Sequence, residues 1–330
     1  MARPKVFVTR KIPHEALDIV ASACDFWIWD AEDTPVPRDV LLREIAGVDG
    51  VLTTWTERID QEFLDAAPNC KVVASFAVGY DNIDIPACTA RRVLVTNTPG
   101  VLTETSADLI WALMMATARR LVEAQKYIEQ GEWVSWSPTL MMGQDINGAT
   151  LGVVGPGRVG SAVIRRAKGF NMEVLYNNPV PMPQLEAQTG ATFRRLDDLL
   201  RQSDFVVVTV PLTQQTRGMF GAREFSLMKP TSVFINTCRG QVVKEIELYE
   251  ALKKGRPWAA GLDVYEKEPI GPNHPLLALP NVVCLPHIAS ASYKTRTAMA
   301  KLAASNLVAA LTGQKVPTPV NAEVLGALVP

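Results

Sequence analysis

The sequence is poor in the residues that build metal centres and disulfide frameworks. Only three of its 330 residues are histidine and five are cysteine. The cysteines are odd in number, widely scattered and form no CxxC pair, a pattern that predicts neither a zinc site nor a set of disulfides. We therefore expect no metal, and reduced thiols as in a cytoplasmic protein. The cysteines are Cys24, Cys70, Cys88, Cys238 and Cys284.

An excess of charge of one sign is also missing. The chain has 33 Lys and Arg against 34 Asp and Glu, and no long block of like charge. Nucleic acids and anionic membranes need a basic face, so we expect neither as a partner. The longest apolar run, Leu109–Ala118, is too short to span a bilayer and predicts a buried helix. Residues 1–10 contain no apolar stretch of secretory length.

What the sequence does contain is a repeated alternation of apolar, strand-like runs and helical stretches. Its composition, 48% apolar and 20% charged, is ordinary for a globular protein, and its length suits about two domains. Most of the runs are continuous, which is typical of strands buried on both faces of a parallel sheet. The sequence therefore predicts an α/β fold with parallel sheets. The predicted strands are 5–9, 25–29, 50–55, 71–76, 93–98, 150–155, 173–178, 204–210, 232–237, 259–265 and 281–286.

These strands form two sets, one within about the first 100 residues and the other after residue 149. A long helical stretch from about Ser106 to Gly131 separates them, and we predict that it connects two α/β domains. A last helical stretch, Ser290–Leu311, follows the final strand. Its return to the first domain would make that domain discontinuous.

A glycine-rich loop follows the first strand of the second set. The sequence TLGVVGPGRVG contains Gly155-x-Gly157-x-x-Gly160, between a predicted strand and a predicted helix. Gly155 permits a tight turn, Gly157 lets the backbone approach a pyrophosphate, and Gly160 lets the helix pack close to the strand. The helix N-terminus then offers N–H groups to phosphates. In this context the motif predicts dinucleotide binding, and a turn without a ligand is the alternative.

Three polar side chains follow three other predicted strands. Arg239 comes after SVFINTC, Glu268 after AAGLDVY, and His287 after NVVCLP. Ligands of open α/β sheets bind beyond the carboxyl ends of strands, so these side chains are placed to converge. His14 begins an exposed-looking helix and His274 lies in a loop rich in Pro, Asn and Gly. His287 is therefore the histidine placed for chemistry, although each residue by itself is also compatible with a structural or surface role.

Taken together, these motifs resemble those of the D-isomer-specific 2-hydroxyacid dehydrogenases, and among them the glyoxylate/hydroxypyruvate reductases. The resemblance covers about residues 70–295 and keeps the family's motif order. The matching segments are 75–84, 96–113, 152–160, 211–216, 235–243, 261–269 and 286–292.

The resemblance implies the architecture and the reaction. It implies two Rossmann-like or flavodoxin-like domains, with cofactor and substrate in the cleft between them. The substrate domain would comprise 1–99 plus 288–330, and the dinucleotide-binding domain 100–287. The implied enzyme reduces a small 2-oxo acid, such as glyoxylate or hydroxypyruvate, to the D-2-hydroxy acid by hydride transfer from NAD(P)H.

The resemblance also assigns residues. Arg239, Glu268 and His287 match the family's catalytic residues, and the backbone N–H groups of Val78 and Gly79 match the loop that holds the substrate carboxylate. Family members are commonly homodimers, and Trp136 matches a tryptophan that enters the neighbouring subunit's site, an ordinary core position being the alternative. The expected cofactor-binding residues are Gly155, Gly157, Arg158, Val159, Gly160, Asn178, Pro211, Thr216, Thr237, Cys238, Asp263 and Ala289.

The sequence departs from the family pattern at two positions. Ala289 stands where a glycine is usual. Asn178 replaces the usual acidic residue after the second nucleotide strand, so the repulsion of an NADP 2′-phosphate is lost. No Lys or Arg occurs between Lys168 and Arg194, so we expect use of both cofactors with a mild preference for NADH.

The residues themselves suggest a mechanism. The planar fork of Arg239 suits a carboxylate and a neighbouring carbonyl, and His287 is a proton donor that Glu268 would keep charged. Other members of the family remain alternatives. Val78 stands where phosphite-oxidising relatives have lysine, and Glu268 argues against formate oxidation. A nucleotide-sensing co-repressor on the same scaffold also stays open, because such proteins keep the triad.

Overall fold

The computed structural model describes residues 2–327, which form two compact units. The split unit comprises the residues up to Leu102 together with those from Ala291 onward, and the central unit comprises Thr103–Ser290. The sequence placed the two boundaries at 99/100 and 287/288. No helix within residues 2–327 has the length and apolar character needed to cross a membrane.

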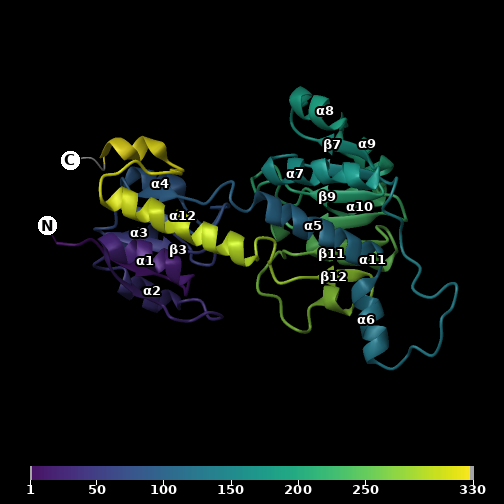
Figure 1. Ribbon diagram of the computed structural model, residues 1–330, viewed down its shortest axis with the longest axis horizontal. Coiled ribbons are helices and arrows are strands. Elements are labelled where there is room, and N and C mark those ends of the chain that lie inside the picture. The colour runs from purple at the N-terminus through teal and green to yellow at the C-terminus, as the bar shows by residue number, and fades with distance from the viewer. Residues whose placement is uncertain (1, 328–330) are drawn as a thin grey trace. The chain divides into compact units, whose positions relative to one another are not determined.

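The split unit contains a five-stranded parallel sheet in the order β2-β1-β3-β4-β5. Alternate residues of each strand face opposite sides, so each face has its own apolar core. Helices α1 and α12 cover one face, where α12 returns the chain to this unit (Figure 1), and α2, α3 and α4 cover the other. The elements are β1 (Lys5–Val8), α1 (His14–Ala23), β2 (Asp25–Ile28), α2 (Arg38–Glu44), β3 (Gly50–Thr53), α3 (Gln61–Ala66), β4 (Val72–Ser75), α4 (Ile85–Ala90), β5 (Leu94–Thr96), α12 (Tyr293–Leu311) and η4 (Ala322–Ala327).

The central unit contains a seven-stranded parallel sheet in the order β12-β11-β10-β9-β6-β7-β8. The chain leaves β6 in one direction for β7 and β8 and then resumes on its other side with β9, so the strand order reverses beside β6. Such a reversal is where open α/β sheets bind ligands. Its elements are α5 (Thr103–Ala118), α6 (Leu121–Glu129), β6 (Thr150–Val154), α7 (Arg158–Ala167), η1 (Lys168–Phe170), β7 (Glu173–Asn177), α8 (Pro183–Thr189), β8 (Thr192–Phe193), α9 (Leu196–Gln202), β9 (Phe205–Val208), α10 (Ala222–Leu227), β10 (Val233–Asn236), η2 (Gly240–Val242), α11 (Glu245–Lys253), β11 (Ala259–Leu262), η3 (Pro275–Ala278) and β12 (Val282–Cys284).

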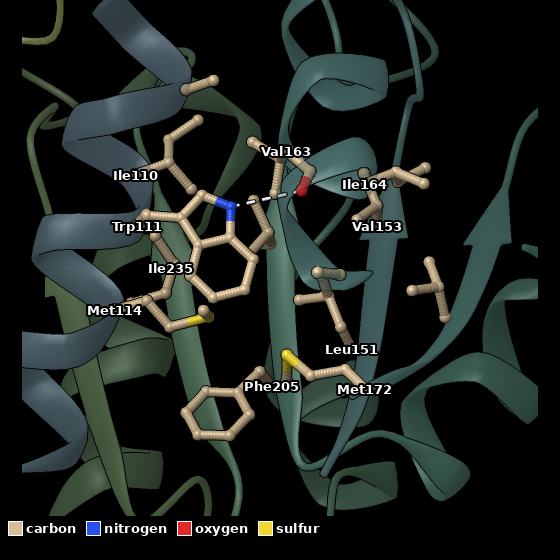
Figure 2. Close-up of a cluster of buried hydrophobic side chains, with 14 of the residues drawn as sticks. Ile110, Trp111, Met114, Leu151, Val153, Val163, Ile164, Met172, Phe205 and Ile235 are labelled. Atoms are coloured by element: carbon tan, nitrogen blue, oxygen red, sulfur yellow. Dashed lines mark hydrogen bonds between the residues drawn. The ribbon is translucent and has the colours of Figure 1, made fainter. Parts of the chain in front are cut away.

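Helices cover both faces of this sheet, as continuous apolar strands require. Helices α5 and α7 lie side by side over one face (Figure 1), and α9, α10 and α11 cover the other. Figure 2 shows Ile110, Trp111 and Met114 of α5 packed with Leu151 of β6. The Trp111 indole N–H donates to the Val163 carbonyl of α7 at 3.2 Å, which satisfies its polar atom in the core.

The α/β class and the parallel sheets are confirmed, with two differences from the predicted elements. The single helix predicted over 106–131 is in fact two, α5 and α6, because Arg120 adopts a left-handed conformation with φ 55°. The short edge strand β8 was missed, because two residues are too few to show a periodicity.

Candidate active site

The glycine loop follows β6, beside the reversal in strand order. Gly155 has φ +85°, and a Cβ there would lie 2.6 Å from Val210 Cγ1. A Cβ on Gly160 would lie 2.6 Å from Thr209 Oγ1 and 2.8 Å from the Gly155 carbonyl oxygen. Both positions therefore require glycine, one for its turn and both for close packing.

Gly157 differs from these two glycines, because nothing lies within 4 Å of the position its Cβ would occupy. It is the residue before α7, and no side chain caps that helix. The first N–H groups of α7, which begins with Arg158 and Val159, thus have no side-chain cap and lie beside an uncrowded glycine, an arrangement that suits a pyrophosphate. The loop fits a dinucleotide, whereas no group of three or more His, Cys, Asp or Glu side chains within residues 2–327 suits a metal ion.

Two further turns at the carboxyl edge of the sheet hold expected cofactor residues. After β9, the Thr216 hydroxyl donates to the Pro211 carbonyl at 2.6 Å and closes that turn. After β10, the Asn236 side chain accepts from the Cys238 N–H at 3.1 Å and donates to the Arg239 carbonyl at 3.0 Å. Thr237 lies within this turn. Desolvation raises the pKa of the Cys238 thiol to about 11, so the thiol stays protonated at neutral pH.

Glu268 and His287 form a hydrogen-bonded pair. The distance from His287 Nδ1 to Glu268 Oε2 is 2.8 Å, and the other carboxylate oxygen, Oε1, accepts from the Tyr265 N–H at 3.0 Å. The side chains are 24% and 13% exposed, so water screens the pair only in part. His287 itself has φ +55°, a strained conformation for a residue with a side chain.

Asp263 explains how this conformation of His287 is held. The carboxylate is fully buried, and its two oxygens accept from the N–H groups of Ile288 at 2.7 Å and Ala289 at 2.8 Å. Burial raises the pKa of Asp263, although the two hydrogen bonds act in the opposite direction. Sequence reasoning missed this anchoring contact. The only available signal was an acid directly after the apolar strand 259–262.

Arg239 lies on the turn after β10, the strand next to β11. Its guanidinium Nη1 donates to the Cys238 carbonyl at 2.8 Å. The adjacent Gly240 packs on the Tyr265–Glu266 peptide so closely that a Cβ there would lie 1.8 Å from the Tyr265 carbonyl carbon. Because β10, β11 and β12 are neighbours in the sheet, the structure brings Arg239, Glu268 and His287 to the same carboxyl edge.

In the split unit, Val78 and Gly79 lie on the loop after β4. The Val78 carbonyl accepts from Asn97 Nδ2 at 2.8 Å, and the Ala77 carbonyl accepts from the Thr98 N–H at 2.8 Å. The N–H groups of Val78 and Gly79 have no acceptor within residues 2–327. The loop thus holds its carbonyl groups internally and leaves two adjacent N–H donors available for an anion.

Trp136 lies in the segment between α6 and β6. Its exposed fraction is 79%, so the alternative of an ordinary core position is wrong for this chain. The segment runs as an extended loop after α6 (Figure 1), and other large apolar side chains are exposed on α6 and on this loop. They are Leu121, Val122, Ile128, Trp133, Val134 and Met142.

The family is shown by comparison with known proteins. The profile of the D-isomer specific 2-hydroxyacid dehydrogenase NAD-binding domain matches residues 111–289. The chain belongs to this family of NAD(P)-dependent oxidoreductases, as the motif resemblance predicted. It is 48% identical over 327 residues to the glyoxylate reductase of Thermococcus kodakarensis, covering 98% of each chain. The glyoxylate reductase of Thermococcus onnurineus is 47% identical over 332 residues, covering 99% of each chain.

Solved structures agree with this assignment. A protein of Thermus thermophilus superposes with a TM-score of 0.90 at 42% identity, covering 96% of this chain and 99% of that one. The NADPH-dependent glyoxylate/hydroxypyruvate reductase of Sinorhizobium meliloti, in complex with NADP and malonate, gives a TM-score of 0.83 at 34% identity and 97% coverage of both chains. A nicotinamide dinucleotide is thus the cofactor class of this chain.

Proposed function

We propose that this protein reduces small 2-oxo acids, such as glyoxylate and hydroxypyruvate, to D-2-hydroxy acids with NAD(P)H. The observation that carries the proposal is the hydrogen-bonded Glu268–His287 pair at the same sheet edge as the glycine loop and Arg239. Relatives at 48% and 47% identity over nearly the whole chain bear the name glyoxylate reductase. The co-repressor alternative has no such support.

The proposed role of Arg239 is to bind the substrate. Its planar fork matches the carboxylate and the 2-oxo oxygen of one small molecule, and its charge polarises the carbonyl. The two adjacent N–H donors of Val78 and Gly79 suit the substrate carboxylate.

The proposed role of His287 is to donate the proton. Its Nδ1 is hydrogen-bonded to Glu268, so the proton would be donated from Nε2. The carboxylate also stabilises the positive charge of the ring before the proton is transferred. As the 2-oxo group becomes an alkoxide, His287 neutralises its developing charge. The Asp263 carboxylate keeps the ring in place through the turn that follows it.

The cofactor would be held by the glycine loop and the neighbouring turns. When bound, the reduced nicotinamide supplies the hydride. The α7 N-terminus suits the pyrophosphate, and the turns after β9, β10 and β12 surround the same edge. The residues assigned to this role are Gly155, Gly157, Arg158, Val159, Gly160, Asn178, Pro211, Thr216, Thr237, Cys238, Asp263 and Ala289.

Steady-state kinetics on a panel of substrates tests the proposal. Glyoxylate, hydroxypyruvate, pyruvate and a bulkier 2-oxo acid are each assayed with NADH and with NADPH, and chiral analysis identifies the hydroxy acid. We expect the highest kcat/KM for glyoxylate or hydroxypyruvate, and the D-product wherever a stereocentre forms. Nucleotide binding without turnover of any 2-oxo acid would instead favour a sensing protein.

The choice between NADH and NADPH depends on the carboxyl end of β7. The expected mild NADH preference assumed that no cation lies near Asn178. Strand β8 changes this, because it pairs with β7 and is followed by Arg194 and Arg195. The Arg194 N–H donates to the Tyr176 carbonyl at 2.8 Å, and the Arg194 carbonyl accepts from the Asn177 side-chain Nδ2 at 2.9 Å, so Arg194 lies beside the end of β7. Neither arginine has an ion-pair partner within residues 2–327, and Arg194 Nη1 donates only to the carbonyl of the adjacent Phe193 there.

We therefore expect both cofactors to be used, with kcat/KM values within about tenfold, or roughly 1.4 kcal/mol. Asn178→Asp should shift the ratio toward NADH, since a carboxylate repels the 2′-phosphate. Arg195→Ala should lower kcat/KM for NADPH several-fold and leave that for NADH within twofold. Arg201→Ala, an exposed arginine of α9, is the matched control. An equal loss with both cofactors would show that Arg195 does not face the phosphate.

Assembly is the remaining part of the proposal. We expect a homodimer in which the exposed apolar side chains of α6 and the loop after it meet a second copy. A cavity of about 490 Å³ lies beside this surface, at the amino ends of β11 and β12 and lined by α6, Met141 and Met142. The site residues follow the carboxyl ends of these strands, so the cavity is distinct from them. We expect the dimer to lie in the cytoplasm.

Trp136 tests this arrangement. If it enters the site of the second copy, Trp136→Ala should relax substrate size, raising kcat/KM for a bulkier 2-oxo acid relative to glyoxylate several-fold. Sedimentation should show a dimer for the wild type. Trp29→Ala, in the other unit, controls for loss of any tryptophan. A monomer that is fully active at nanomolar concentration would contradict the assembly and the role of Trp136.

A further inference from the structure

We propose that Glu245 and His274 form a second histidine–carboxylate pair that positions Glu268, and through it His287, for proton donation. This inference rests on the proposed role of the Glu268–His287 pair and assigns two positioning residues behind it. Neither residue follows a strand end in the manner of the site residues. His274 lies just before η3, and Glu245 is the first residue of α11.

The second pair is well formed and largely removed from water. His274 Nε2 lies 2.9 Å from Glu245 Oε1, and the side chains are only 20% and 18% exposed. The His274 ring meets the Tyr265 ring edge to face, with centroids 6.1 Å apart. The position of Glu245 at the N-terminus of α11 favours a carboxylate, because the helix dipole is positive there. These contacts fix the direction in which Glu245 presents its second oxygen.

The second carboxylate oxygen of Glu245 binds the backbone two residues before Glu268. Glu245 Oε2 accepts from the Glu266 N–H at 3.1 Å, and the Glu266 carbonyl accepts from Gln241 Nε2 at 2.9 Å. Gly240 closes one side of the Tyr265–Glu266 peptide, since a Cβ there would lie 2.4 Å from the Glu266 nitrogen. The Tyr265–Glu266 peptide is therefore fixed by three contacts. Its N–H group is bound by Glu245, the next carbonyl is bound by Gln241, and Gly240 packs against one of its faces.

Tyr265 connects the fixed peptide to both Glu268 and the segment before His287. Its N–H donates to Glu268 Oε1 at 3.0 Å, and its hydroxyl donates to the Leu285 carbonyl at 2.9 Å, two residues before His287. The Tyr265 N–H belongs to the preceding peptide, so a shift of the Tyr265–Glu266 peptide would act on it by displacing Tyr265 as a whole. Such a displacement would weaken the hydrogen bond to Glu268 and loosen the carboxylate that orients His287. A displacement of about 1 Å costs a catalytic group up to roughly 10²-fold in rate.

The inference predicts the effects of two pairs of variants. Glu245→Ala should lower kcat about tenfold with KM for the cofactor within twofold. The control Glu250→Ala, on the same helix and ion-paired with Lys253, should leave kcat unchanged. His274→Leu should also lower kcat, and His274→Gln should restore most of it, because the glutamine amide nitrogen can replace Nε2 as a donor. Thermal melts establish that each variant is folded.

An NMR measurement on the protein without cofactor distinguishes a loss of His287 positioning from a general loss of structure. The chain has only three histidines, so ring ¹H–¹⁵N spectra of the apo protein contain few signals, and His14→Gln assigns one of them. Glu245→Ala and His274→Leu should both shift the His287 ring signals, and His274→Gln should return them toward the wild-type positions. Glu250→Ala should not shift them.

The variant Glu268→Gln separates the positioning role of Glu245 and His274 from the catalytic role of the Glu268–His287 pair. If it lowers kcat and shifts the His287 signals while Glu245→Ala and His274→Leu do neither, the positioning role is wrong and the proposed function stands. Equal losses in His274→Leu and His274→Gln would likewise overturn the positioning role. If Glu268→Gln leaves both kcat and the His287 signals unchanged, the proposed catalytic pair itself fails.

Discussion

Replacing His287 with alanine should lower kcat by roughly 10²–10⁴-fold, the contribution usual for a positioned acid. The reason is geometric. Glu268 binds Nδ1 and Asp263 anchors the following turn, so the ring is held for donation from Nε2. His14→Ala is the matched control, because His14 is 84% exposed in the other unit.

The loss should be confined to the chemical step. Cofactor affinity, followed by the fluorescence of NADH in the absence of substrate, should change less than twofold. Exogenous imidazole should restore part of the activity of the alanine variant, because it replaces the missing donor. A His287→Ala enzyme with near-normal kcat would remove this residue from the mechanism.

Replacing Arg239 with lysine should cost roughly 10–10²-fold in kcat/KM for glyoxylate, about 1.5–3 kcal/mol, the range for a charge-assisted hydrogen bond. Lysine keeps the positive charge but has no planar fork, so it cannot bind two oxygens in parallel. The backbone of the turn should be unaffected, because Asn236 binds the main-chain groups of Cys238 and Arg239.

The control for this variant is Arg201→Lys, an exposed arginine of α9 paired with Asp198. It should leave kcat/KM unchanged, and thermal melts should show both variants folded. If Arg239→Lys retains the wild-type kcat/KM for glyoxylate, charge alone is sufficient at this position and the bidentate role is wrong.

The sequence specified those features that depend on local chemistry. Continuous apolar runs predicted the strands, because a strand buried on both faces has no polar side. The glycine loop was evident from its spacing, and the structure gives the reason for that spacing. Gly155 has a positive φ, and a Cβ on Gly160 would lie 2.8 Å from the Gly155 carbonyl oxygen. The positions of Arg239, Glu268 and His287 after apolar strands pointed to one sheet edge.

Other features depend on contacts between distant residues and were not visible in the sequence. Strand β8 brings Arg194 and Arg195 beside the end of β7, which removed the argument for an NADH preference. The sequence set His274 aside as a loop residue, whereas the fold pairs it with Glu245, 29 positions away. The carboxylate of Asp263 binds N–H groups 25 and 26 residues further along the chain.

The difference has a physical cause. A strand, a helix or a glycine turn is determined by the side chains within a few positions of it, so the sequence by itself determined the α/β class, the dinucleotide loop and the candidate catalytic residues of this protein. Hydrogen bonds that orient those residues join segments that meet only after parallel strands have paired. The tertiary structure alone therefore decided which oxygen of Glu268 faces His287 Nδ1, which carboxylate anchors the turn behind His287, and that Trp136 is exposed rather than buried.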